Sequence, residues 1–214
     1  MPHKLNWNTV TPLLRAILNQ LMSCELFKSF RLVGGTSLSL QLGHRLSIDI
    51  DLFTDAAYGS IDFKELDIYF RNTFSYVSES GLELVGMGKS YFVGNAEDDA
   101  VKLDLYYTDS FIQPELIINS IRMASIEEVI AMKIDVVQRG GRKKDFWDLH
   151  ELTNSYSLAQ MLSLHAQRYP YGHDEGLIKS NFTAFDKADE DFDPICLKGK
   201  YWELIKYEIL QFVN

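Results

Sequence analysis

The 214-residue sequence predicts an α+β protein, in which a mixed β-sheet with flanking helices precedes a C-terminal helical lobe. Up to residue 107, segments with helical spacing of apolar residues alternate with short strand-like runs. After Pro114, almost every segment has the 3.6-residue period of a helix. We therefore expect an α/β lobe over residues 1–120 and a mainly helical lobe over residues 121–214.

The N-terminal half is predicted to contain three helices and about five strands. Residues 9–24 have apolar side chains at helical spacing, with Thr11 available as N-cap and Pro12 in the first turn. Glycine positions and alternating apolar residues define the other elements of this half. These are a strand over 30–33, a short helix from Thr36 that stops at Gly43, a strand over 47–53, a helix over 60–74, two strands that meet at Gly88 and Lys89 (82–88 and 90–95), and a strand over 100–107.

The C-terminal half begins with a short strand over 121–124 and a helix that starts after Ser125. The motif Ser-Ile-Glu-Glu is a capping box, because Ser and Glu three residues apart can satisfy each other's free backbone N–H groups. The first helix is expected to end near Gln138, and the acidic segment 184–199 is expected to be a surface loop. Further helices are predicted over 144–152, 157–169 and 202–213.

The composition is that of an ordinary globular protein, with 46% hydrophobic and 24% charged residues. No apolar run approaches the roughly 20 residues of a membrane-spanning helix, and no secretory signal begins the chain, so we expect a cytoplasmic protein without membrane contact. The formal net charge of −9 disfavours a broad nucleic-acid surface. The basic run QRGGRKK (138–144) leaves two alternatives open, a local basic patch or a solvated loop.

Acidic residues recur on one face of two predicted strands. Asp49 and Asp51 alternate with Ile48, Ile50 and Leu52, so both carboxylates are expected on the face opposite the apolar row. The strand AVKLDLYY repeats the pattern, with Lys102, Asp104 and Tyr106 on one face. If the two strands are neighbours, Asp104 is the third carboxylate of a cluster.

Such a cluster suits Mg²⁺, which prefers oxygen ligands and commonly joins protein carboxylates to substrate phosphates. Upstream, Gly34 and Gly35 can let backbone N–H groups approach a phosphate, and Thr36 and Ser37 open a helix whose N-terminus favours negative charge. A solvent-exposed pair of aspartates is the alternative that the pattern alone leaves open.

The combination of these motifs resembles a known superfamily. Gly34-Gly35, thirteen further residues (36–48) and then Asp-Ile-Asp-Leu resemble the signature of polymerase-β-like nucleotidyltransferases. GGTSL followed by HRLSIDIDLF resembles the AbiEii/AbiGii-type toxin family, and ASIEEVIAMKIDVVQRGGRKKDFWDLHEL resembles the later motifs of that family. The resemblance covers about residues 30–152 and implies a nucleotidyltransferase-like mixed sheet.

The resemblance implies a role for each matching residue. Asp49 and Asp51 match the metal-binding pair, and Asp104 matches the third carboxylate. The expected catalytic set also contains Lys133, the motif lysine, and Asp148, which has Asp145 beside it. The expected nucleotide-binding residues are Gly34, Gly35, Thr36, Ser37, Arg45, Ser47 and Lys133. Asp135, which replaces a small apolar residue, and Lys144, which replaces an arginine, depart from the family pattern.

Lys133 is unusual on its helix, because the stripe formed by residues 126, 129, 130, 133, 134 and 137 is otherwise apolar. Its side chain could snorkel to water or reach a triphosphate in the cleft between the lobes. Asp148 shares a face with Leu149 and Leu152, so it is expected to point inward and pair with Lys133 or Arg139. His44 fits a structural role better than a catalytic one.

The resemblance implies an NTP-dependent transferase with a two-ion Mg²⁺ site, acting as the toxin of a toxin–antitoxin or phage-defence abortive-infection system. Its acceptor is expected to be tRNA, and a cognate antitoxin protein is an expected partner. Two alternatives remain open from the sequence. One is a non-catalytic nucleotide-binding regulator, and the other is a nucleotidyltransferase with a protein or small-molecule acceptor.

Overall fold

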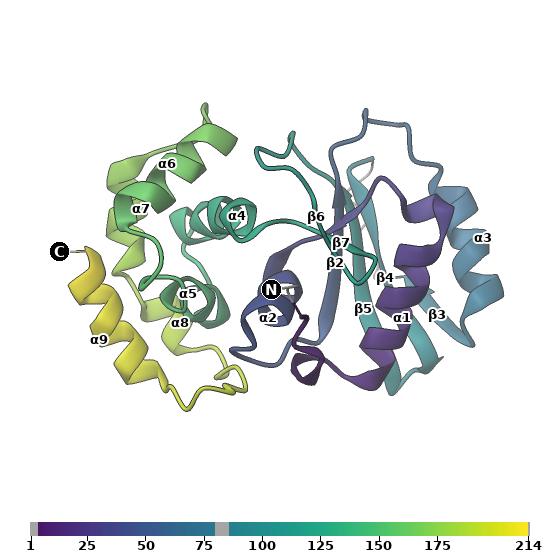
Figure 1. Cartoon of the computed structure of the whole chain (residues 1–214), viewed down its shortest axis with the longest axis horizontal. Helices are drawn as coiled ribbons and strands as arrows, with labels where there is room; N and C mark the ends of the chain where they lie inside the picture. The colour runs from purple at the N-terminus through teal and green to yellow at the C-terminus, as the bar shows by residue number, and fades with distance from the viewer. Residues whose placement is uncertain (1–3, 80–85, 214) are drawn as a thin grey trace.

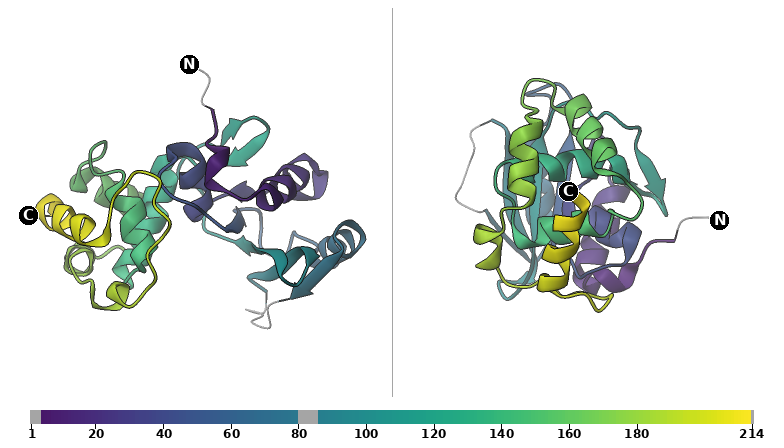
Figure 2. Two further views of the ribbon diagram at one scale, coloured as in Figure 1. Left: turned by 90° about the horizontal axis from the view of Figure 1, so that it is seen from below. Right: turned by 90° about the vertical axis from the view of Figure 1, so that its left-hand side faces the viewer.

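The computed structural model describes residues 4–79 and 86–213, which form a sheet-containing part and a helical part side by side (Figures 1 and 2). Seven strands form one mixed sheet in the order β3-β4-β5-β2-β1-β7-β6. β2 pairs in parallel with β5, and β1 in parallel with β7, while the other neighbours are antiparallel. The strands are β1 (Arg31–Leu32), β2 (Asp49–Thr54), β3 (Tyr76–Glu79), β4 (Gly88–Ala96), β5 (Asp99–Tyr107), β6 (Leu116–Ile118) and β7 (Ile121–Met123).

Two helices, α1 (Pro12–Ser23) and α4 (Ile126–Gln138), begin at the caps that the sequence predicts. Thr11 accepts a hydrogen bond from the Leu14 N–H, and Ser125 accepts one from the Glu128 N–H. In the described part of the chain, no helix has both the length and the apolar character to cross a bilayer. The α-helices are α1 (Pro12–Ser23), α2 (Gly34–Leu42), α3 (Phe63–Thr73), α4 (Ile126–Gln138), α5 (Lys143–His150), α6 (Leu158–Arg168), α7 (Glu175–Phe182), α8 (Asp186–Asp189) and α9 (Trp202–Val213), with 3₁₀ turns at Trp7–Thr9 and Glu25–Phe27.

The buried apolar side chains form two clusters. The first packs α1 and α3 against one face of the sheet, with Phe27 and Phe70 at its centre. The second joins α4 to the C-terminal helices and includes Phe146 and Trp202. α2 contacts β2 as well as α4 and α5, so it lies between the sheet and the helical part (Figure 1).

The structure differs from the sequence predictions in several elements. β4 begins at Gly88, so no turn lies at Gly88 and Lys89. A Cβ at Gly88 would lie within 2.7 Å of the Tyr106 Cα, which explains the glycine by close strand approach. Residues 82–85 of the other predicted strand lie outside the described residues. The short strands β3 and β6 and the helix α7 were not predicted, and α8 interrupts the predicted loop 184–199.

α2 and β2 also begin differently from their predicted bounds. α2 starts at Gly34 rather than at Thr36, so both glycines belong to its first turn. Ile50 and Leu52 are buried as the alternation predicts, but Ile48 precedes the strand and is 67% exposed. The face assignment therefore holds only within the paired part of the strand.

We expect Phe27→Ala to lower the free energy of unfolding by about 3–5 kcal/mol, because the ring is fully buried against Phe30, Tyr69 and Phe70. Urea denaturation followed by tryptophan fluorescence measures the loss. Phe192→Ala is the matched control, because Phe192 is fully exposed and its removal should change stability by less than about 0.5 kcal/mol. Equal midpoints for the two variants would contradict this assignment of the core.

Candidate functional site

Three aspartates lie together on the face of the sheet opposite the first apolar cluster. In the parallel register of β2 and β5, Asp51 is the partner of Asp104 and Asp49 is the partner of Lys102. The Lys102 ammonium donates to Asp104 Oδ2 at 2.5 Å. The second oxygen, Asp104 Oδ1, is buried and has no hydrogen-bond partner among the described residues. The structure thus brings together the three carboxylates that the sequence predicted as metal ligands.

The charge of the central carboxylate of this cluster, Asp51, is only partly compensated, by Lys133 and Lys144. The pKa of Asp51 is raised to about 6, first by burial and then by the neighbouring charges of Asp104 and Asp49. A bound cation would offset this repulsion, so the carboxylates of this cluster are candidate ligands of a divalent metal. As they stand, however, no three His, Cys, Asp or Glu side chains within residues 4–79 and 86–213 are close enough to hold a metal ion.

The two glycines of α2 lie against charged side chains. Gly34 has a φ of +66°, and a Cβ there would lie 2.6 Å from Asp51 Oδ2. A Cβ at Gly35 would collide with the guanidinium of Arg45. The helix therefore approaches the site more closely than any other residue type permits, and its first-turn N–H groups have no acceptor within the helix.

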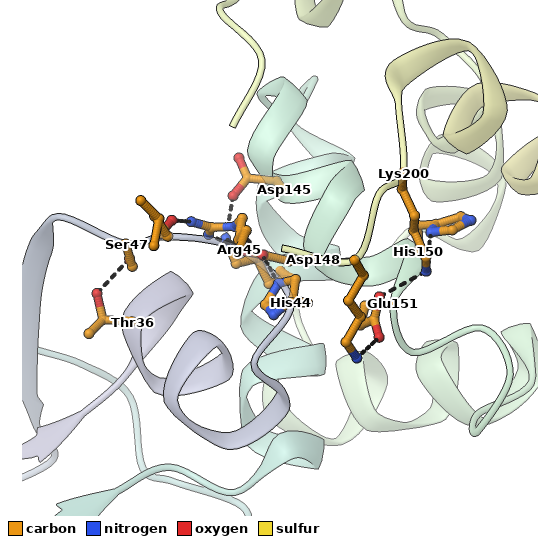
Figure 3. Close-up of polar contacts among 12 residues, drawn as sticks. Thr36, His44, Arg45, Ser47, Asp145, Asp148, His150, Glu151 and Lys200 are labelled. Atoms are coloured by element: carbon orange, nitrogen blue, oxygen red, sulfur yellow. Dashed lines mark hydrogen bonds and ion pairs between the residues drawn. The ribbon is translucent and has the colours of Figure 1, made fainter. Parts of the chain in front are cut away.

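The hydroxyl groups that follow the glycines point into the protein. Thr36 Oγ1 lies 2.7 Å from Ser47 Oγ and donates to the Asp49 carbonyl at 2.5 Å (Figure 3). Ser37 Oγ donates to the Ala124 carbonyl at 3.3 Å. Any contact of Thr36 or Ser37 with a nucleotide therefore depends on the backbone. Their nucleotide-binding role stays a prediction.

A pocket of about 320 Å³ opens between the acidic strand and the helical part. Asp49, Asp51 and the two glycines form one wall, together with Arg45 and Ser47. Opposite them lie basic side chains from the end of α4 and the start of α5. The rest of the lining is apolar apart from Thr108, Asp135 and Asp145. The basic side chains are those of Lys133, Arg139, Arg142 and Lys144. The apolar lining consists of Val33, Phe53, Val129, Met132, Val136 and Tyr169.

Asp148 is the centre of a buried network behind this pocket. It accepts two hydrogen bonds from Arg45, Nε to Oδ1 at 2.6 Å and Nη2 to Oδ2 at 2.8 Å. His44 Nε2 lies 2.8 Å from Oδ1, and the Lys133 ammonium lies 2.8 Å from Oδ2 (Figure 3 shows the first two partners). Burial disfavours the charged form, but Lys133 and Arg45 hold the pKa of Asp148 well below its usual range. His44 thus has the structural contact that the sequence favoured.

Lys133 does not snorkel to bulk water. Its ammonium is buried and donates to Asp145 Oδ1 at 2.5 Å in addition to its contact with Asp148. Burial alone would lower the pKa of Lys133, but Asp148 and Asp145 raise it. Arg139 pairs with Asp135 instead of Asp148, so the first of the two predicted partners of Asp148 is found.

Lys144 lies in the site, although the sequence identified it only as a lysine at a position where the family has an arginine. Its ammonium lies in the pocket, 3.8 Å from Asp49 Oδ2. Burial, followed by the positive charge of Arg142, lowers its pKa. The only signal in the sequence was its place in the basic run 138–144. That run lines the pocket through Arg139, Arg142 and Lys144.

Comparison with known proteins identifies the fold and the family. The family model of the AbiEii nucleotidyltransferase toxin of type IV toxin–antitoxin systems matches residues 16–206. The chain belongs to this family. An uncharacterised protein of Aquifex aeolicus, to which this AbiEii-family chain is similar, is 26% identical over 202 residues, covering 90% of each chain.

Two solved structures have the same fold as this AbiEii-family protein. One is a candidate nucleotidyltransferase from Helicobacter pylori, with a TM-score of 0.60 and 20% identity over 94% of this chain and 89% of that chain. The other is MenT4, a nucleotidyltransferase toxin from Mycobacterium tuberculosis, with a TM-score of 0.57 and 15% identity over 92% and 83% of the two chains. The predicted nucleotidyltransferase-like mixed sheet and the predicted family resemblance are confirmed.

We expect Asp148→Asn to destabilise the AbiEii-family fold by about 3–5 kcal/mol at pH 7, because it leaves Arg45 and Lys133 buried without their shared carboxylate. The pKa of Asp148 is lower in the folded state than in the unfolded state. Its stabilisation is therefore complete above about pH 4 and is lost as pH falls below that value. Urea midpoints from pH 7 to pH 2 should converge for the two proteins. The exposed Asp98→Asn is the control, and a constant difference at every pH would contradict the role of this charge.

We expect Asp51→Asn to stabilise the metal-free protein at pH 8 by about 2 kcal/mol. The pKa of Asp51 is about 6 in the folded state, above the unfolded value, so the folded protein loses stability as pH rises through 6. At pH 4 the variant and the parent should have similar urea midpoints. A variant that is less stable than the parent at pH 8 would contradict the conclusion that the charged Asp51 carboxylate destabilises the folded protein.

Proposed function

We propose that the protein transfers a nucleoside monophosphate from an NTP to an acceptor hydroxyl on tRNA, as the toxin of its toxin–antitoxin system. The observation that carries this proposal is the buried Asp51, flanked by Asp49 and Asp104, at the wall of a pocket that basic side chains also line. A cation site facing a basic pocket suits a Mg-nucleotide, whose triphosphate needs both kinds of contact.

Asp49 and Asp51 would hold two Mg²⁺ ions, with Asp104 beside them on the neighbouring strand, which is supported by the raised pKa of Asp51 and by its register with Asp104. When bound, Mg²⁺ neutralises phosphate charge and makes the α-phosphorus more electrophilic. The protein supplies the rigid placement of the three carboxylates. Two neighbouring strands fix their backbone positions, and Lys102 fixes Asp104.

We place the triphosphate between the first turn of α2 and the basic side chains of the opposite wall. Gly34 and Gly35 line the pocket at the start of α2, and the partial positive charge of the helix N-terminus favours phosphate there. Lys144 is the ammonium closest to Asp49 and contacts phosphate oxygens. The apolar wall around Val129 and Tyr169 receives the base and ribose.

Lys133, Arg45 and Asp148 act mainly by positioning. The charges of Lys133 and Arg45 are held by Asp148, so they stabilise the pocket wall and add positive potential to it. Ser47, which lies just before the acidic strand, contacts Thr36 of α2 through its hydroxyl group. The catalytic role of Asp148 in this proposal is therefore indirect.

The transfer step is an in-line displacement. The acceptor hydroxyl oxygen attacks the α-phosphorus, the bond between that phosphorus and the oxygen bridging to the β-phosphate breaks, and pyrophosphate leaves. The hydroxyl proton passes to a carboxylate. We assign this role to Asp104, because its Oδ1 is buried and has no hydrogen-bond partner among the described residues.

The family supports an antitoxin as the cellular partner, and the toxin named MenT4 shares the fold. An enzyme of tRNA and NTP would act in the cytoplasm. The basic side chains at the pocket suit an RNA acceptor locally, despite the net charge of −9 of the whole chain.

We expect purified protein, incubated with each α-³²P-labelled NTP, Mg²⁺ and total cellular RNA and protein, to label tRNA with at least one NTP. Asp49→Asn and Asp51→Asn should each reduce the rate by about 10²–10³-fold, because each removes a charge that the transition state requires. Ile117→Ala, at the far edge of the sheet, is the control. Label in protein or in a small molecule, instead of in RNA, would show that the acceptor is not tRNA. Nucleotide binding without any labelled product would favour a non-catalytic regulator.

A further inference from the structure

The sheet has an uncovered region next to the acidic cluster. On one face of β4 and β5, the side chains of Tyr91, Val93, Val101, Leu103 and Leu105 are buried in the first apolar cluster. The alternate side chains point to the other face, where Phe92 is 38% exposed and the Lys102 side chain is also 38% exposed. Antiparallel strands commonly present one such open face, but an exposed phenylalanine on it is a candidate contact surface.

Strand register arranges this open face in rows that lead to the acids. Phe92 on β4 is the partner of Lys102 on β5, which is the partner of Asp49 on β2. The next row is Ser90, Asp104 and Asp51. Neighbouring strands lie about 4.8 Å apart, so the ring, the ammonium and the carboxylates form one continuous surface.

A third row, Gly88, Tyr106 and Phe53, closes this surface on one side. Gly88 has no side chain to cover the neighbouring Tyr106, whose hydroxyl lies 2.9 Å from Ser90 Oγ. The rings of Phe53 and Tyr106 are in edge contact, with centroids 6.1 Å apart. The surface therefore offers aromatic side chains on both sides of the Ser90–Asp104 row.

This surface lies on the other side of β2 from the nucleotide pocket. The pocket shares Asp49, Asp51 and Phe53 of β2 with this surface but is lined by no residue of β4 or β5. In the sheet order, β5 and β4 follow β2 on the side away from β1, whereas α2 packs over β2 on the pocket side. A substrate on β4 and β5 can thus reach the carboxylates beside a nucleotide in the pocket.

We propose that the face formed by Phe92, Lys102 and Tyr106 binds the unpaired terminal nucleotide of an RNA acceptor. The terminal base stacks on the Phe92 ring, the adjoining phosphate contacts the Lys102 ammonium, and the attacking hydroxyl lies at Asp104. Stacking of bases on exposed aromatic rings of a sheet, with a cation for the backbone, is a general mode of single-strand binding. This inference rests on the proposed nucleotidyl transfer to RNA.

Lys102 has two partners in this arrangement. Its contact with Asp104 neutralises one of the three negative charges that would otherwise repel the acceptor phosphate. Its exposed side chain can still present the remaining N–H donors to solvent or phosphate. A protein acceptor would have no need of the adjacent stacking ring and ammonium, so the surface favours RNA.

The test compares Phe92→Ala, Phe92→Trp and Lys102→Met with the full-length parent, and uses Phe192→Ala as a matched control at a fully exposed site. Binding of a fluorescein-labelled single-stranded RNA oligonucleotide is followed by anisotropy without NTP. KM values for RNA and for the NTP that supports labelling are measured separately. Thermal unfolding verifies that each variant is folded.

We expect Phe92→Ala to raise the Kd and the KM for RNA about 5-fold or more, while KM for the NTP is unchanged and Phe92→Trp restores binding. Lys102→Met should reduce the slope of log Kd against log salt by about 0.7, the value for one phosphate contact on a single strand. RNA binding and KM of Phe92→Ala equal to those of Phe192→Ala, with RNA still labelled by the parent, would overturn this inference and leave the proposed function standing. Failure of the parent to label any RNA would instead refute the RNA acceptor and this surface with it.

Discussion

The arrangement of the site depends on one buried carboxylate, that of Asp148. It accepts hydrogen bonds from Arg45, which precedes the acidic strand, and contacts Lys133 on α4. Removing any one partner would leave a charge in a region that water does not reach. Asp148 therefore fixes three segments, α5, α4 and the chain before β2, at the distances that form the pocket.

A second set of contacts, made by the backbone of residues 195–197, holds the chain segment before β2. The Leu46 N–H donates to the Ile195 carbonyl, and the Leu197 N–H donates to the His44 carbonyl, both at 2.9 Å. Lys200, which follows this segment, pairs with Glu151 at 2.8 Å (Figure 3). Arg45 is thus fixed through its side chain by Asp148 and through its backbone neighbours by residues 195–197. Since Asp49 follows only four residues later, these contacts also determine where the acidic strand begins.

The charged cluster around Asp148 and the acidic cluster on the sheet differ in how far positive charges balance their carboxylates. This difference indicates that the two clusters have different roles. Around Asp148, the two carboxylates of Asp145 and Asp148 face the two cations of Arg45 and Lys133, so the pKa of each acid is lowered. On the sheet, Asp51 lies between two further acids, and its pKa is raised to about 6. Folding alone would select against the second arrangement, because its charge repulsion destabilises the native state. Such a cost is typical of a site that binds an external cation.

Sequence patterns predicted those features that depend on local periodicity. Strand alternation placed Asp49, Asp51 and Asp104 on one face, and register then brought Asp104 beside Asp51. The partners of Asp148 were harder to predict, because Arg45 lies 103 positions away and its direction depends on the packing of α2 against α5. The inward hydroxyls of Thr36 and Ser37 were missed for a related reason. A residue in a first helical turn can face the ligand or the interior, and only the neighbouring segments decide.

The two glycines of α2 connect these constraints. Phosphate binding and close packing both require a residue without a Cβ, so a glycine pair by itself does not distinguish them. In this protein the packing requirement is already explicit, since Gly34 meets Asp51 and Gly35 meets Arg45. Any side chain at Gly34 would displace the central carboxylate, and any side chain at Gly35 would displace the arginine that Asp148 holds. The glycines therefore determine how closely the N-terminus of α2 approaches the acids, and the geometry available to a phosphate follows from that approach.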